Sequence, residues 1–88
     1  MENNAALRQK IVSLAVAAGE GGFSERELAD AGHALPAVGF SSLAYMRLID
    51  SIENDLGVYL DPEADVEHYE SIDSITALVV ASGGEVRA

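Results

Sequence analysis

Two adjacent serines, Ser41 and Ser42, lie in the segment GFSSLAYM, immediately before an apolar helix-forming run. Ser41 is placed to be the N-cap, where its hydroxyl oxygen accepts a hydrogen bond from a free amide of the first turn. Ser42 would then be the first helical residue, with its hydroxyl in solvent at the positive end of the helix dipole. Such a hydroxyl could carry a phosphodiester, because free amides and the dipole favour nearby negative charge. Taken alone, however, the two serines are better explained as a simple helix start.

Other motifs with possible chemistry are incomplete. The GEGG segment at 19–22 lacks the Lys-Ser/Thr pair of a phosphate-binding loop and predicts a flexible turn. The acidic stretch from Asp61 has valine and isoleucine where a calcium loop requires glycine and glutamate, so we expect a solvated loop and no metal site. A small hydrolase using Ser42 with His33 or His68 is the weakest functional hypothesis, because no acid–base group lies at a recognisable spacing.

The charge of the chain limits its partners. Its 88 residues include 5 basic and 15 acidic residues, a net charge of −10, and no cysteine, which excludes disulfides and thiolate metal sites. Residues 1–40 hold 3 basic and 5 acidic groups, or −2, and residues 41–88 hold 2 and 10, or −8. This charge disfavours nucleic acid and anionic membranes and favours proteins with basic surfaces. Without an evident signal or a membrane-length apolar run, we expect one monomeric, cytoplasmic domain over residues 1–88.

The elements that must position the serines are helices. Apolar spacing predicts three principal helices, over residues 5–18, 41–56 and 71–82. The residues expected on their buried faces are Leu7, Ile11, Leu14 and Ala18 in the first, Met46, Ile49, Ile52 and Leu56, widened by Tyr45 and Leu48, in the second, and Ile72, Ile75, Leu78 and Val79 in the third. The β-branched pair Val79–Val80 would also suit a strand. On the second helix Arg47, Asp50, Asn54 and Asp55 should face water.

Shorter elements fill the connections. Ser24 and Glu27 form a capping-box pattern for a short helix that stops at Gly32, after which Pro36 and Gly39 keep the chain extended or turning. Phe40 and Tyr45 are spaced as a hydrophobic staple around the Ser41 cap. Gly57 is expected to close the second helix, Val58 and Leu60 to anchor the next loop in the core, and a helical turn or two to follow Pro62. Ser71 is expected to cap the last helix. The predicted fold is all-α, a small antiparallel bundle of three principal helices plus short helices, with a long first loop.

The segment VGFSSLAYMRLIDSIENDLGVYLDPE, residues 38–63, resembles the core of acyl carrier proteins and the related peptidyl carrier proteins. Their pattern is Gly-x-Asp-Ser-Leu, an apolar helix that ends in acidic residues, and then Phe/Leu-Gly-Val-x-Leu/Ile-Pro/Asp. Gly39, Ser42, Leu43, the SIENDLG segment and VYLD match it in order. The resemblance extends over about residues 5–82, as a preceding helix, a long loop, a short third helix and a last helix that opens with SIDSI.

The resemblance implies a carrier without catalytic activity of its own. A phosphopantetheinyl transferase would attach 4′-phosphopantetheine from coenzyme A to Ser42, and the thiol of this arm would hold acyl groups as thioesters. The missing cysteine agrees with this, because the reactive thiol comes from the arm. The helix over 43–56 would be the docking surface for synthase or ligase enzymes with basic surfaces. By that match the docking candidates are Leu43, Arg47, Asp50, Glu53 and Asp55.

Two departures from the family pattern refine this expectation. Ser41 stands where acyl carriers usually have aspartate, and Arg47 and Asp50 replace an acidic and an apolar residue common in fatty-acid carriers. We therefore expect a discrete acyl carrier for polyketide or related secondary metabolism. The alternatives are a peptidyl or aminoacyl carrier of a nonribosomal peptide pathway, and a carrier-like helical interaction module that is never modified.

Overall fold

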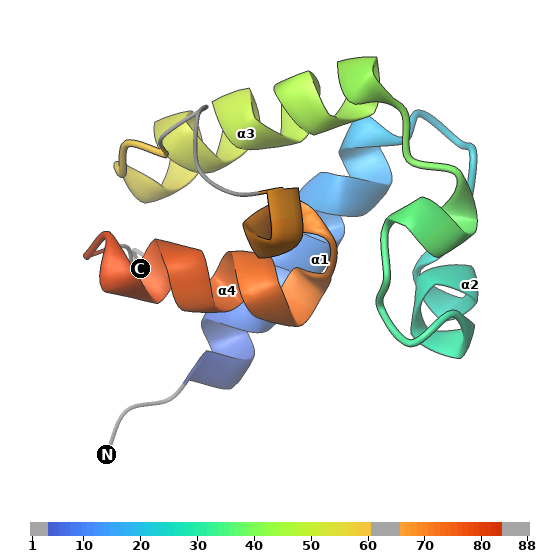
Figure 1. Ribbon diagram of the computed structural model, residues 1–88, viewed down its shortest axis with the longest axis horizontal. Helices are drawn as coiled ribbons and strands as arrows, with labels where there is room; N and C mark the ends of the chain where they lie inside the picture. Colours follow the sequence, from blue (N-terminus) through green and yellow to red (C-terminus); the bar gives the residue numbers. More distant parts are fainter. Residues whose placement is uncertain (1–3, 61–65, 84–88) are drawn as a thin grey trace.

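The computed structural model describes residues 4–60 and 66–83, which form a small all-α bundle (Figure 1). Its α-helices are α1 (Asn4–Ala18), α2 (Glu25–Asp30), α3 (Ser42–Leu56) and α4 (Ile72–Ala81), and its 3-10 helices are η1 (Pro36–Val38) and η2 (Val66–Tyr69). The predicted fold class is confirmed, and Val79–Val80 belong to helix α4. The acidic loop expected from Asp61 and the helix start at Pro62 lie outside the described residues.

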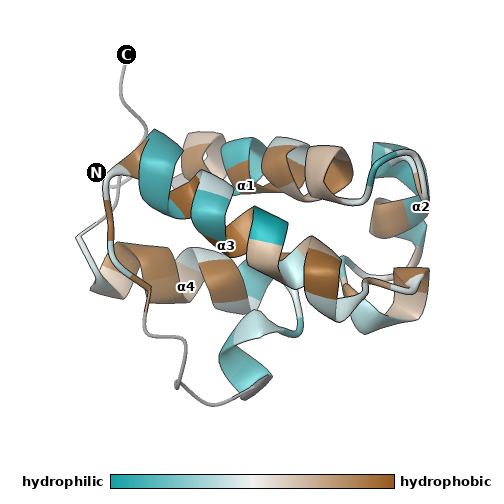
Figure 2. Ribbon diagram, turned by 90° about the horizontal axis from the view of Figure 1, so that it is seen from above, coloured by the Kyte–Doolittle hydropathy of each residue, from teal (hydrophilic) through white to brown (hydrophobic). Residues whose placement is uncertain are grey.

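Helix α1 runs antiparallel to α3, because Lys10 of α1 pairs with Asp55 near the end of α3, whereas Glu20, just after α1, pairs with Arg47 in the first half of α3. Helices α3 and α4 run in the same direction, as Figure 1 shows from the colour order along each. Arg8 of α1 pairs with Asp73 at the start of α4. In Figure 2, the view from above, α3 is projected between α1 and α4, in agreement with its place over both in Figure 1. None of the described helices is both long enough and apolar enough to cross a membrane.

One continuous apolar core joins the helices. Its fully buried members come from α1, α2, the first connection, α3 and α4, and they are Ile11, Ala15, Leu28, Leu35, Leu48, Ile52, Ile72, Ile75 and Val79. Leu56, the last residue of α3, and Leu60, in the loop after it, extend the core. The burial of Leu60 was predicted, whereas Val58 is only half-buried. Because the first connection contributes Leu28 and Leu35, it is a packed part of the domain.

The predicted buried faces need four corrections. Met46 is 66% exposed, whereas Leu48 is fully buried at the centre of the α3 stripe with Ala44, Ile52 and Leu56. At 100° per residue, Met46 lies about 120° around the helix from Ile52, outside the apolar stripe. Leu14, Ile49 and Leu78 are only partly buried and pack against the core from its edge. Val12 and Ala15 of α1, Leu48 of α3 and Thr76 of α4 are buried in their place.

The long first connection is fastened to the start of α4. Ala34 and Ser71 form an isolated antiparallel bridge in which Leu35 N donates to Glu70 O at 2.9 Å and Ile72 N donates to His33 O at 3.0 Å. Ser24 and Glu27 form the predicted capping box at the start of α2. The segment from Pro36 to Gly39, predicted to be extended or turning, turns as the 3-10 helix η1, and Gly39 is its C-cap. The connection therefore approaches α3 along a fixed path.

Candidate functional site

Helix α3 begins at the two serines with the predicted division of backbone roles. Ser41 is the N-cap, with extended backbone angles (φ −87°, ψ 167°), and its Oγ accepts a hydrogen bond from Ala44 N at 3.1 Å. Ser42 is the first helical residue. The cap satisfies one of the amides that a helix start leaves without a partner. Ser42 is therefore not needed as a cap.

An aromatic stack fixes the direction from which the chain enters α3. The rings of Phe40 and Tyr45 meet edge-on at a centroid distance of 4.8 Å, which confirms the predicted staple, and Phe23 packs on Phe40 at 5.9 Å. Just before Phe40, Gly39 adopts a left-handed conformation (φ 75°), which glycine reaches without the cost that a Cβ imposes. Burial, together with the charge of Glu70, raises the pKa of Tyr45 above its usual range.

The Ser42 side chain is exposed, and its hydroxyl makes no hydrogen bond within residues 4–60 and 66–83. Two large apolar side chains lie beside it on the outer face of α3, Leu43 at 54% exposure and Met46 at 66%. Positions 42 and 46 are four residues apart, so Ser42 and Met46 are neighbours on this face. The site thus combines an unused hydroxyl, a helix N-terminus and two solvent-facing apolar side chains.

The other predicted docking residues differ in their surroundings. Arg47 pairs with Glu20 at 2.9 Å and Asp55 pairs with Lys10 at 3.4 Å, so both charges are shared with α1 or the turn after it. Asp50 is exposed and forms no hydrogen bond or ion pair in the described part of the chain. Glu53 is half-buried, and its Oε2 accepts a hydrogen bond from Leu60 N at 2.9 Å. Glu53 therefore holds the loop after α3, whatever else it contacts.

Glu20 also belongs to this site, although its sequence context does not predict it. It lies in the glycine-rich turn after α1 and has a left-handed backbone (φ 51°), although it is not glycine. A non-glycine residue in this conformation is uncommon and costs free energy. The only signal in the sequence was a single charged residue inside GEGG, which predicted a turn but not an ion pair with Arg47.

The two histidines lie apart from this chemistry. His33 is held by the bridge to α4, where its main-chain carbonyl accepts from Ile72 N, and His68 belongs to η2. Neither side chain forms a hydrogen bond with Ser42 within the described segments. Residues 4–60 and 66–83 contain no group of three or more His, Asp or Glu side chains that could hold a metal ion.

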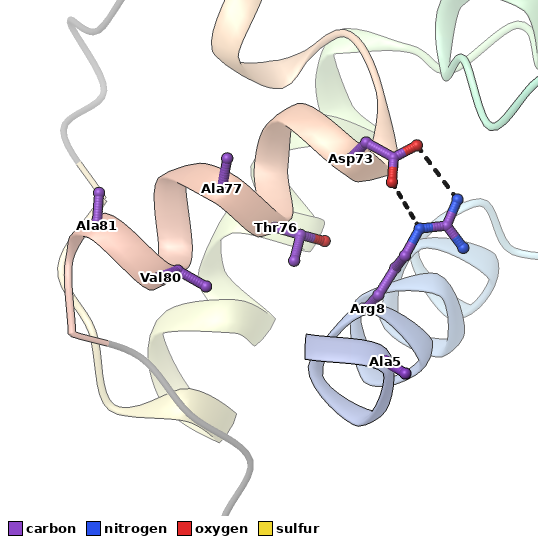
Figure 3. Close-up of a pocket in the computed structure, with 7 residues that line it drawn as sticks. All are labelled: Ala5, Arg8, Asp73, Thr76, Ala77, Val80 and Ala81. Carbon is purple, nitrogen blue, oxygen red and sulfur yellow. Dashed lines mark hydrogen bonds and ion pairs between the residues drawn. The ribbon is translucent and has the colours of Figure 1, made fainter. Parts of the chain in front are cut away.

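A separate hollow of about 530 Å³ lies between α1 and α4 (Figure 3). Its walls are small and apolar, from Ala5, Ala77, Val80 and Ala81, and Thr76 and the Arg8–Asp73 pair complete it. Arg8 Nε donates to Asp73 Oδ1 at 2.6 Å and Nη2 to Oδ2 at 3.2 Å. The hydrogen bond from Arg8 lowers the pKa of Asp73, and the same bond raises that of Arg8. None of the residues predicted to act with Ser42 lines this hollow.

The start of α3 thus brings together Ser41, Ser42 and Leu43, with Arg47 in the next turns, and adds Met46 and Glu20 to the predicted set. Asp50, Glu53 and Asp55 lie farther along the helix. Comparison of the chain with protein-family models, with curated proteins and with solved structures yields no match.

Proposed function

We propose that this protein is a carrier that bears a 4′-phosphopantetheine arm on Ser42 and has no catalytic activity of its own. The arm would tether acyl intermediates as thioesters, and a phosphopantetheinyl transferase would install it. The proposal rests on the resemblance of residues 38–63 to acyl and peptidyl carriers and on the surroundings of Ser42.

In the modification, Ser42 Oγ attacks the β-phosphorus of coenzyme A. A new phosphorus–oxygen bond forms to Ser42, the bond to the 3′,5′-ADP portion breaks, and 3′,5′-ADP leaves with the electron pair. The transferase supplies the magnesium ion and accepts the serine proton. The carrier supplies an accessible hydroxyl at a helix N-terminus, where a phosphodiester charge is favourable.

The observation that carries the proposal is the unequal use of the two serines. Ser41 Oγ accepts the capping hydrogen bond from Ala44 N, whereas the Ser42 side chain is exposed and its hydroxyl forms no hydrogen bond with the part of the chain that the structure describes. Because Ser41 already fills the cap position, the Ser42 hydroxyl is left available for modification. The exposed apolar pair Leu43 and Met46 beside it gives an enzyme a surface to contact.

Ser41 in place of the family's aspartate, together with Arg47 and Asp50, favours a role in polyketide or related secondary metabolism over fatty-acid synthesis. The cargo is expected to be an acyl group. Its chemical class can be read directly, because an acyl or aminoacyl group retained on the arm adds its own mass to the protein.

Intact-protein mass spectrometry tests the proposal. The chain is incubated with coenzyme A, magnesium and a broad-specificity phosphopantetheinyl transferase, and we expect one phosphopantetheinyl addition. Ser42→Ala should abolish the addition, whereas Ser41→Ala should retain it.

Two results would contradict the proposal. Addition that survives in Ser42→Ala would refute the assigned residue. No addition to the wild-type chain, with a known carrier modified in the same tube, would favour an unmodified interaction module.

A further inference from the structure

The Glu20–Arg47 ion pair joins the turn after α1 to the outer face of α3. Its Nη1–Oε1 distance is 2.9 Å, and both side chains are substantially exposed, at 61% for Glu20 and 43% for Arg47. A surface pair of this kind contributes little to folding stability. Glu20 nevertheless occupies a left-handed position (φ 51°) between glycines, where another glycine would fit at lower cost. Stability of the turn therefore does not explain the glutamate.

The position of Arg47 suggests what the glutamate does. Arg47 is the only basic residue of α3, which also contains Asp50, Glu53 and Asp55. It lies four residues from Leu43, on the same exposed face. Unpaired, its charge would face any basic protein that approached Ser42 along this face. Glu20 neutralises that charge from outside the helix.

The outer face of α3 consequently has two parts. Near Ser42 it is apolar and nearly neutral, with Leu43 and Met46 beside the compensated Arg47. Farther along it is acidic, because no residue in the described segments pairs with the charge of Asp50. The complementary surface is an apolar patch flanked by basic groups, and the net charge of −10 would speed the approach of such a protein.

We propose that Glu20 belongs to the surface on which the transferase that modifies Ser42 docks, and that it acts there by masking the positive charge of Arg47 from the basic surface of that enzyme. This inference rests on the proposed function and adds to it a residue more than twenty positions before the modified serine. Glu20 is a positioning residue for the encounter and takes no part in the phosphoryl transfer.

A charge cycle tests the inference through the transferase rate constant kcat/KM. Glu20→Gln exposes Arg47 and should lower kcat/KM by about two- to fivefold at low salt, the range of exposed charge pairs. Arg47→Gln leaves Glu20 unpaired, makes the face more acidic and should raise kcat/KM. The double variant should return close to wild type, and all differences should shrink at high salt.

If the transferase instead presents a carboxylate to Arg47, Glu20→Gln should raise kcat/KM and Arg47→Gln should lower it, and that result would overturn the inference. Equal rates for all four proteins would overturn it as well. The wild-type rate distinguishes failure of the proposed function from failure of the Glu20 role, because a wild type that is not modified refutes the proposed function. A modified wild type with an unresponsive cycle refutes only the role of Glu20.

Glu20→Gly separates masking from folding. This variant removes the carboxylate but relieves the left-handed strain, so its thermal midpoint should not fall below that of wild type. If Glu20 masks Arg47, the variant should lose as much kcat/KM as Glu20→Gln. If the glutamate served only to hold the turn, a variant of undiminished stability would keep the wild-type rate, and masking would be wrong. Asp30→Asn, on the exposed end of α2, is the matched control for loss of one acidic charge.

Discussion

Ser41→Ala removes the acceptor of the α3 cap, and its effect on stability can be worked out from the structure. The variant leaves Ala44 N without the Ser41 Oγ that lies 3.1 Å away. Ala44 is only 5% exposed, so water replaces the lost acceptor poorly. Loss of a serine cap costs about 1 kcal/mol, within a range of about 0.5 to 2 kcal/mol. Ser42→Ala removes an exposed hydroxyl that has no hydrogen-bond partner among the described residues, and it should change stability by less than about 0.5 kcal/mol.

These free energies translate into separable melting temperatures. With an unfolding entropy of about 2.1 cal/mol/K per residue, the 88-residue chain loses about 5 °C for each 1 kcal/mol. Thermal unfolding followed by far-ultraviolet circular dichroism should therefore show a fall of about 5 °C for Ser41→Ala and little change for Ser42→Ala. Ser41→Asp retains an acceptor and adds a negative charge at the helix N-terminus, so its midpoint should match or exceed wild type.

The opposite ranking would refute this reasoning. If Ser42→Ala were destabilised as much as Ser41→Ala, the Ser42 hydroxyl would have a structural role. The division of tasks between the two serines would then be wrong, whatever the outcome of the modification assay. A melting temperature unchanged in both variants would show that neither serine holds the helix start.

Three further predictions concern stability and pH. Glu53→Ala should lower the free energy of unfolding in urea by about 1 to 2 kcal/mol, because Leu60 N loses a charged acceptor. Asp50→Ala, the control, should change it by less than about 0.5 kcal/mol. Equal effects of the two substitutions would contradict the role of Glu53 in holding the loop after α3. Leu48→Ala should lower the free energy of unfolding by about 2 to 5 kcal/mol, because Leu48 is fully buried, and Met46→Ala should lower it by less than about 0.5 kcal/mol. Met46→Ala should nevertheless slow modification by the transferase. A large loss of stability in Met46→Ala would show that Met46 is buried after all. Because Arg8 lowers the pKa of Asp73, the ionised carboxylate stabilises the fold above its ordinary pKa of 3.8, and this contribution disappears as the pH falls through the lower folded value. Asp73→Asn should therefore be less stable than wild type near neutral pH, by at most about 1 kcal/mol because the Asp73 side chain is 66% exposed. The urea midpoints of the two proteins should converge in acid. A difference that stays constant with pH would contradict the link between stability and the ionisation of Asp73.

Local sequence signals predicted most of the fold. The Ser24–Glu27 box, the Ser41 and Ser71 caps and the left-handed Gly57 depend on neighbours within four residues, and all are present. Such signals do not depend on tertiary packing, so the spacing of the residues is enough to predict them. For the same reason the staple of Phe40 on Tyr45 could be predicted.

Features that depend on distant contacts could not be predicted in the same way. Met46 was misplaced because a spacing of three and four residues fits two neighbouring apolar rows of α3, and only packing against α1 and α4 selects the row through Leu48. The 3-10 turn η1 depends on Leu35 being buried and bridged to the start of α4. Glu20 was missed because its partner lies 27 positions away, and no local pattern records that contact.

The bridge between Ala34 and Ser71 has a consequence for the order in which the domain opens. Leu35 is fully buried, and its amide is bound to Glu70 O, so this loop amide is held by a segment 35 residues farther along the chain. It can exchange with solvent only when the first connection separates from α4. Native-state hydrogen exchange should accordingly find Leu35 N and Ile72 N among the slowly exchanging amides, opening together with α4. The connection that leads to Ser41 and Ser42 would thus share the cooperative unfolding of the bundle, and the helix start would keep its geometry for as long as the domain is folded.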